Sequence, residues 1–138
     1  MHPITHAQNR PDHPAIVMAA SGEVVTYGAM DATANRFAQL LRAHGLGPND
    51  AFAVLMENNV WYLQLVWGSQ RAGTMLVPIS TRLTAPEIAY ILKDSEAKLL
   101  ISSTKFAEVL SALPAAGADI PTLVLGSGAS DDFEAALA

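Results

Sequence analysis

The segment AFAVLMENNVWYLQLVWGSQRAGTMLVPI, residues 51–79, decides the fold. A short apolar run at residues 51–56 comes first, a helical segment at 60–72 follows, and a second apolar run covers 74–79. Gly73 stands between the last two, where a glycine commonly closes a helix. The order strand, helix, strand, with nearly continuous apolar strands, predicts parallel strands that are covered on both faces.

The downstream sequence repeats this alternation. Thr84-Ala85-Pro86-Glu87 is a capping box that predicts a helix to about Asp94. A strand is expected at 98–102, an amphipathic helix at 106–113, and a last strand at 122–125. The predicted fold class is therefore α/β, a mostly parallel sheet with helices on both faces.

The upstream sequence predicts a β-hairpin that precedes this sheet. Two β-like runs, 15–19 and 23–27, are joined by the turn residues 20–22, and a helix is expected from Met30 until Gly45 ends it. Residues 1–14 hold prolines and histidines without periodicity, and we expect an irregular amino-terminal arm there. The predicted organisation is an arm at 1–14, an α/β unit at 15–125, and at 126–138 a linker with the start of a next helix.

Composition excludes several classes of protein. The 138 residues carry 8 Lys and Arg against 13 Asp and Glu, a net charge of -5 that gives no basic surface for nucleic acid. No run reaches the roughly 20 apolar residues of a transmembrane helix, and the amino terminus does not resemble a secretory signal. The absence of cysteine excludes disulfides and thiolate catalysis. These observations predict a cytoplasmic protein.

The charged fraction, 15%, is low beside a hydrophobic fraction of 51%. We therefore expect further polypeptide to cover part of the surface, and self-association where that cover is missing. The helical segment 60–72 is the leading contributor, because apolar side chains surround it. Pro78, near the end of the next apolar run, predicts that this residue lies at the end or edge of its strand.

The candidate chemical motifs are weak. Gly126-Ser127-Gly128-Ala129-Ser130 invites comparison with a phosphate loop, but it lacks the lysine and two aspartates follow it, so a linker is expected. His2, His6 and His13 are expected to be solvated and not to ligate a metal. Trp61 and Trp67 are either core residues or part of a substrate pocket. The residues alone thus predict no catalytic apparatus.

The segment VTYGAMDATANR, residues 25–36, resembles the amino-terminal signature of the adenylate-forming (AMP-binding) superfamily, with Met30 in place of the usual leucine. Four later stretches resemble the same family in the same order. They are LLRAHGLGPND at 40–50, MENN at 56–59, RAG at 71–73 and STRLTAPEIAYILKDS at 80–95. The resemblance covers residues 15 to about 125.

The resemblance implies the amino-terminal subdomain of an acyl-CoA synthetase, or fatty-acid–CoA ligase. The parent reaction would join a carboxylate to ATP, release pyrophosphate, and then form a thioester with CoA, with Mg²⁺ as cofactor. The family's phosphate loop and catalytic lysine are not in this sequence, so the chain alone is expected to bind no cofactor and to be inactive. Its expected partner is the remainder of the parent enzyme.

One side chain has an implied ligand role. In some members of the family an arginine in the motif shared by residues 80–95 approaches the CoA phosphate, which implies this role for Arg82. The alternative is a surface salt bridge beside Glu87. Two other functions stay open, namely an adenylation domain of the peptide-synthetase type and a stand-alone, non-catalytic interaction module with this fold.

Overall fold

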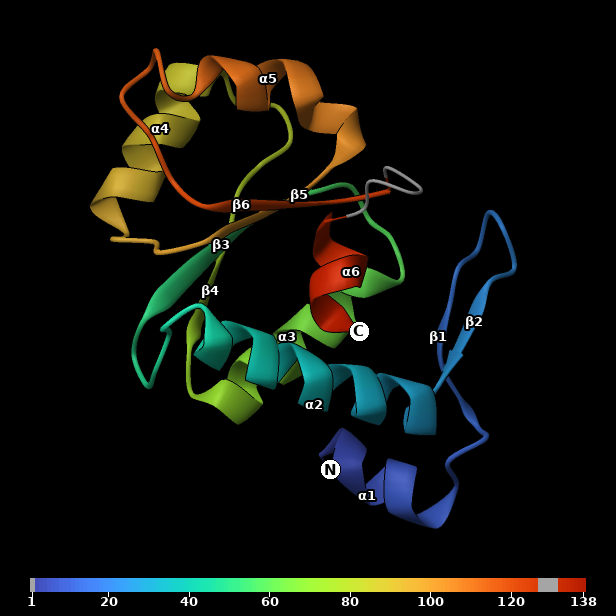
Figure 1. The fold of residues 1–138 in the computed structure, drawn as a ribbon. Helices are drawn as coiled ribbons and strands as arrows, with labels where there is room; N and C mark the ends of the chain where they lie inside the picture. The colour runs from blue at the N-terminus through green and yellow to red at the C-terminus, as the bar shows by residue number, and fades with distance from the viewer. Residues whose placement is uncertain (1, 127–131) are drawn as a thin grey trace.

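The structure is a computed structural model that describes residues 2–126 and 132–138. Strands and helices alternate from β3 onward (Figure 1). In chain order the elements are α1 (Pro3–Asn9), β1 (Pro14–Val17), β2 (Val24–Thr26), α2 (Tyr27–Ala43), β3 (Ala51–Leu55), α3 (Trp61–Ala72), β4 (Met75–Pro78), α4 (Ala85–Asp94), β5 (Leu100–Ser103), the short 3-10 helix η1 (Thr104–Phe106), α5 (Ala107–Ala112), β6 (Thr122–Leu125) and α6 (Asp132–Leu137).

The main sheet has four parallel strands in the order β4-β3-β5-β6. All five residues of β3 are buried, as expected for a central strand whose apolar run is continuous. β4 lies at one edge of the sheet, and Pro78 is its last residue. This position confirms the prediction from Pro78, because proline cannot donate a backbone hydrogen bond to a further strand.

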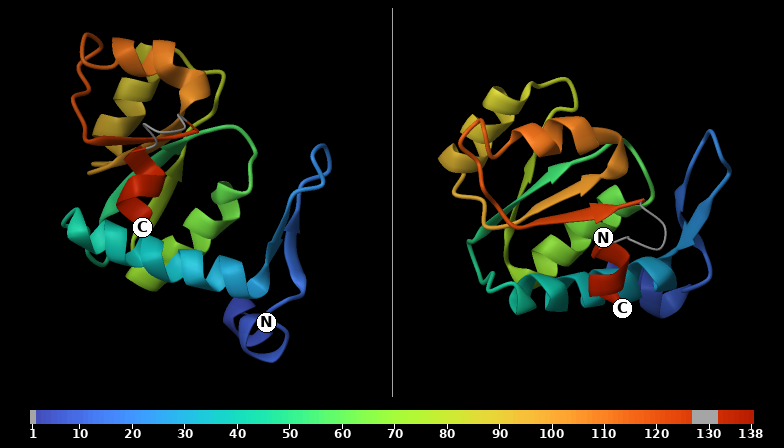
Figure 2. Two further views of the ribbon diagram at one scale, coloured as in Figure 1. Left: turned by 45° about the vertical axis from the view of Figure 1, so that its right-hand side comes forward. Right: turned by 45° about the horizontal axis from the view of Figure 1, so that its top comes forward.

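Helices cover both faces of this sheet (Figure 2). On one face, Phe52 and Val54 of β3 pack in a core with residues of α2, α3 and α6. On the other, Ala53 and Leu55 pack in a second core with residues of α4 and of the segment around α5. Alternate side chains of one strand thus enter two cores, and the predicted α/β class is confirmed.

The β-hairpin is also confirmed, since β1 and β2 pair antiparallel. The helix after it begins at Tyr27, three residues before the expected Met30. The cause is Thr26, whose Oγ1 accepts the N–H of Ala29 at 3.2 Å and so caps the helix at an earlier residue. Gly45 follows the helix with φ of 77°, a left-handed conformation that glycine adopts without strain.

The expected irregular arm at 1–14 contains the helix α1 instead. Pro3 is at the first helical position, where its fixed φ suits a helix, and His2 Nδ1 accepts the N–H of Ile4 at 3.2 Å. Ring contacts hold this helix on the body of the protein: His2 lies 5.0 Å from Trp67, and His6 lies 4.9 Å from Tyr27. The cap at His2 and Pro3 is local, whereas these ring contacts join residues that are distant in the sequence.

The carboxyl-terminal helix α6 belongs to the same core as α2 and α3. Phe133 is fully buried, with its ring 6.0 Å from that of Phe37 and 5.3 Å from that of Trp61. The α/β unit, predicted for residues 15–125, therefore includes this helix as well. The expected linker at 126–130 lies, apart from Gly126, outside the described residues.

Candidate functional site

The sheet has a topological switch point between β3 and β5. The chain leaves β3 for β4 on one side through α3, and β5 then pairs with the other side of β3. α3 and α5 cover opposite faces of the sheet. In open α/β sheets, ligands bind outside the carboxyl ends of the strands at such a point. The carboxyl ends of β3 and β5 are thus the place in this fold where a site is expected.

Glu57, directly after β3, occupies this position. Its carboxylate accepts a hydrogen bond from Ser103 Oγ at 2.5 Å and lies 3.3 Å from Lys105 Nζ. Partial burial raises the pKa of Glu57, but the Ser103 hydroxyl, the backbone and Lys105 together outweigh burial and hold that pKa below its usual range. A carboxylate that stays ionised and paired is unsuited to proton transfer near neutral pH.

Two further hydroxyl groups link the strands at their carboxyl ends. Ser102 Oγ donates to the carbonyl oxygen of Leu55 at 2.7 Å, and Thr104 Oγ1 donates to that of Gly126 at 3.4 Å. Together with Glu57, these groups tie the carboxyl ends of β3, β5 and β6 to one another. Sequence reasoning missed this polar cluster, although polar residues directly after two apolar runs were a signal for it.

Arg82 lies on the loop after β4, where the carboxyl ends of the strands also lie. Its side chain is exposed, and none of the three ion pairs in residues 2–126 and 132–138 includes it. The expected alternative partner, Glu87, accepts instead the N–H and the hydroxyl of Thr84, both at 2.7 Å, and these bonds lower the pKa of Glu87. The guanidinium of Arg82 is thus open to an anionic group.

The structure places Trp61 and Trp67 in different surroundings. Trp61 packs against Phe133, whereas Trp67 packs against His2 of the amino-terminal segment. The space beside Trp67 is too small to hold a water molecule. The role of Trp61 and Trp67 in a substrate pocket stays a prediction.

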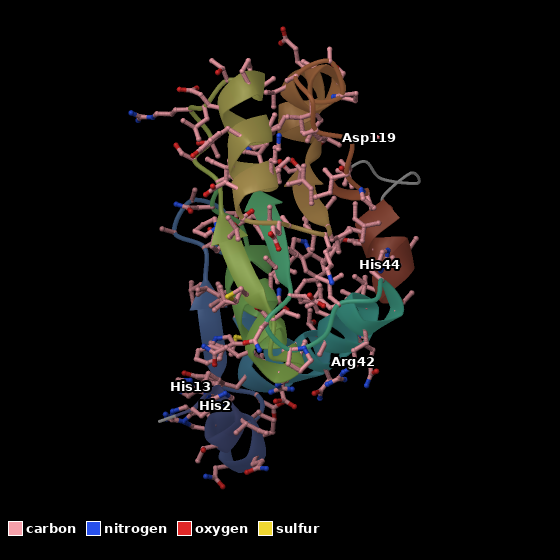
Figure 3. All side chains as sticks on the ribbon, turned by 90° about the vertical axis from the view of Figure 1, so that its left-hand side faces the viewer. His2, His13, Arg42, His44 and Asp119 are labelled. Atoms are coloured by element: carbon pink, nitrogen blue, oxygen red, sulfur yellow. The ribbon has the colours of Figure 1, made fainter. Side chains whose placement is uncertain are left out.

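The histidines do not converge. His2 and His13 lie beside α1, well apart from His44 at the end of α2 (Figure 3). His6 and His13 instead flank Tyr27, with ring centroids at 4.9 and 6.3 Å. In the part of the chain that the structure describes, no group of three or more His, Cys, Asp or Glu side chains could hold a metal ion.

Three residues of the quoted family signatures meet between α2 and α3, a contact that sequence reasoning also missed. The guanidinium of Arg71 forms an ion pair with Asp31, and it donates to the Asp31 carbonyl oxygen at 3.0 Å and to Asn35 Oδ1 at 2.5 Å. Arg71 and Asp31 are partly buried, with 16% and 27% of their side chains exposed. We call Asp31, Asn35 and Arg71 the helix latch.

The α/β fold and the family signatures agree with the comparison of this chain with known proteins. The family model described as "AMP-binding enzyme" matches residues 4–136. The chain belongs to this family of adenylate-forming enzymes. None of the helices in residues 2–126 and 132–138 is long and apolar enough to cross a membrane.

Individual relatives place the chain within the family. It is 40% identical over 111 residues to the fatty acid–[acyl-carrier-protein] ligase ScoC of Streptomyces coeruleorubidus. The aligned region covers 80% of this chain and 21% of ScoC. It is 43% identical over 91 residues to the long-chain-fatty-acid–CoA ligase FadD13 of Mycobacterium tuberculosis, and this aligned region covers 66% of this chain and 18% of FadD13. The chain thus spans about a fifth of the length of these relatives.

A solved structure gives the same placement. The N-terminal domain of FACL13 from M. tuberculosis superposes with a TM-score of 0.85 and 34% identity, covering 98% of this chain and 34% of that domain. The chain therefore corresponds to the amino-terminal part of these ligases, as the sequence resemblance implied.

Proposed function

We propose that the chain is the amino-terminal segment of an acyl-CoA synthetase. The parent enzyme would activate a carboxylic acid with ATP to an acyl-adenylate and pyrophosphate, and would then transfer the acyl group to CoA. The observation that supports this proposal is the superposition of nearly the whole chain on the N-terminal domain of FACL13. A cytoplasmic location of the parent stays a prediction.

The residues of this segment do not fit ATP or Mg²⁺. Two of the three lysines, Lys98 and Lys105, are paired with Asp50 and Glu57, and no glycine-rich loop in the described residues ends in a lysine. Phosphoryl and adenylyl transfer depend on positioned cations. We therefore expect the 138-residue chain to be inactive by itself, and its proposed partner is the remainder of the enzyme.

Arg82 does fit a phosphate of CoA, because its guanidinium is exposed and unpaired in the described part of the chain. A second candidate acceptor is the thiol of an acyl-carrier protein, because ScoC is named as a ligase for that acceptor. With either acceptor, CoA or an acyl-carrier protein, the first step would be formation of the acyl-adenylate.

The test is a chimera of FadD13 in which residues 4–136 of this chain, the region that the family model matches, replace the corresponding amino-terminal segment. We expect the chimera to form fatty acyl-CoA from ATP, acid and CoA, and the 138-residue chain alone to show no ATP–pyrophosphate exchange above a heat-killed control. A chimera that melts cooperatively but forms no acyl-adenylate would contradict the proposal, and so would exchange catalysed by the chain alone.

Arg82→Gln in the active chimera tests the ligand role. Loss of a charge-assisted hydrogen bond should raise KM for CoA about tenfold, or more, while ATP–pyrophosphate exchange stays unchanged. Arg36→Gln, at an exposed arginine on α2, is the matched control and should leave both values unchanged. An unchanged KM for CoA in Arg82→Gln would remove Arg82 from the site.

A further inference from the structure

The helix α1 lies on the side of α2 that faces away from the sheet (Figure 1). None of its residues is buried. After it, the carbonyl oxygens of Pro11 and His13 accept the N–H groups of Gly28 and Tyr27 at 2.8 and 3.0 Å, which ties the chain to the start of α2. Because α1 itself buries no side chain, little free energy holds it in place.

A histidine closes each end of α1. At the amino end, His2 Nδ1 accepts the N–H of Ile4 at 3.2 Å. At the carboxyl end, His6 Nδ1 lies 3.3 Å from Nε and 3.1 Å from Nη2 of Arg10, and it accepts from both because a guanidinium can only donate. Both histidines therefore carry their single proton on Nε2, and a second proton on Nδ1 abolishes these hydrogen bonds.

Protonation of these two rings destabilises α1 at both ends. At His2 it removes the cap and places a positive charge at the amino end of the helix, where the helix dipole is also positive. At His6 it removes the hydrogen bonds with Arg10 and leaves two like charges side by side. The rings of Trp67 and Tyr27, next to His2 and His6, attract a cation and act in the opposite direction. At exposed sites this attraction is weaker than a hydrogen bond to a charged donor, so the neutral rings favour the docked helix.

The other charged groups on this side of the protein do not neutralise the added charges. Pro3 of α1 lies over the helix latch and shares a narrow space with Asp31 and Arg71. The Asp31 carboxylate is already paired with Arg71, so the two groups together carry no net charge. Asp12, in the turn after α1, is exposed and forms no ion pair in residues 2–126 and 132–138. An exposed carboxylate interacts only weakly with a nearby cation.

We propose that α1 is a pH-sensitive cover of the helix latch. It is docked while His2 and His6 are neutral, and it separates from α2 and α3 when both are protonated. The two backbone hydrogen bonds to the start of α2 stay in place, so residues 2–10 are the part that is released. The latch and Trp67 then become accessible to water. The proposal concerns the 138-residue chain itself and does not depend on the proposed function.

Hydrogen exchange of the 138-residue chain tests the cover, because exchange reports local opening. Protection factors of the amides in residues 3–10, corrected for the intrinsic effect of pH, are measured by mass spectrometry at about pH 7.5 and about pH 5, the range in which histidine titrates. We expect them to fall about tenfold, or more, at the acid pH, while those of α4 stay within about twofold. Protection of α1 that is equal at both pH values, or higher at pH 5, would overturn the proposal. A parallel fall in α4 would overturn it too, because the whole chain would then have opened.

Variants identify the groups responsible. In the double variant His2→Asn/His6→Asn, the amide oxygens accept the same N–H groups at every pH, so α1 should stay protected at pH 5. His13→Asn is the matched control and should keep the pH dependence of the wild type. His13 Nδ1 donates to the carbonyl oxygen of Pro14 at 3.1 Å, and protonation of its Nε2 leaves this bond intact.

An equal fall of protection in the double variant and in the wild type would show that the two histidines are not the cause. The second measurement is an NMR titration of the His2 and His6 rings in the wild-type chain. We expect the release of α1 to share the midpoint of these titrations, and a release at a different pH would also overturn the proposal.

Discussion

Gly68 marks the closest approach of α3 to α2, and Gly68→Ala tests how tightly the two helices pack. A Cβ atom at this position would lie 2.6 Å from Phe37 Cδ1, 3.0 Å from Phe37 Cβ and 3.0 Å from the carbonyl oxygen of Ala34. Phe37 is fully buried, and a backbone oxygen cannot rotate away. The added methyl group must therefore push the helices apart or displace the ring.

The expected magnitude follows from two opposing effects. Overpacking of a filled core costs about 1–3 kcal/mol, and replacing glycine by alanine inside a helix contributes about 1 kcal/mol of stability. Because the contacts of the new Cβ include fixed backbone, we expect the steric cost to lie in the upper half of its range. The net loss in the free energy of unfolding is then about 1–2 kcal/mol.

Urea unfolding, followed by tryptophan fluorescence, measures this loss. With a slope of about 2 kcal/mol per M, the midpoint should fall by about 0.5–1 M. Gln70→Ala, at an exposed position of the same helix, is the control and should change stability by less than about 0.5 kcal/mol. Phe37→Leu should reduce the cost of Gly68→Ala, because it removes part of the ring that the methyl group meets. A midpoint that is unchanged or raised in Gly68→Ala would refute the reasoning.

Three other predictions concern single side chains. The pKa of Glu57 is lowered in the folded state, so the ionised carboxylate stabilises the fold at neutral pH and this stabilisation is lost as the pH falls. Glu57→Gln should therefore make the urea midpoint less dependent on pH between pH 7 and pH 4. Thr84→Ala should lower the midpoint by the equivalent of about 0.5–2 kcal/mol, because the capping box with Glu87 is broken, and an unchanged midpoint would place the start of α4 elsewhere. Leu63 on α3 is 49% exposed, so Leu63→Ser should weaken self-association through this helix. Sedimentation over a concentration series measures this, and a strictly monomeric wild-type chain would contradict the prediction.

The elements that depend on local signals could be predicted from the sequence. α4 begins and ends where the capping box and the apolar periodicity placed it, at Ala85 and Asp94, and β6 covers the expected residues 122–125. Gly45 and Gly73 both have positive φ at the ends of helices. The helix caps join residues a few positions apart, and the apolar run of β6 is visible in a short window although its partner β5 is distant in the sequence.

The features that were missed depend on contacts between distant residues. α1 is fixed by ring contacts such as that of His2 with Trp67, and the latch joins Asp31 to Arg71 across 40 positions. The polar cluster around Glu57 depends on β3 and β5 being neighbours, which follows from topology and not from local composition. A single sequence gives the residues of such clusters without their pairing.

The latch gives part of the family signature a structural role in this chain. Asp31, Asn35 and Arg71 bond to one another, and the signature threonines Thr26 and Thr84 stand at the caps of α2 and α4. A side chain that orients two helices must satisfy several partners at once, so these residues act in the architecture of the chain. Arg82 is exposed and has no ion-pair partner in residues 2–126 and 132–138, and the family resemblance gives it a ligand role. Other signature cations are exposed without an ion pair there as well, namely Arg36, Arg42 and Lys93, but no ligand role is proposed for them. Mutation can therefore separate the structural residues of the signature from its one proposed ligand group. Variants of the latch should change the free energy of unfolding, whereas Arg82 variants of the chimera should change KM for CoA.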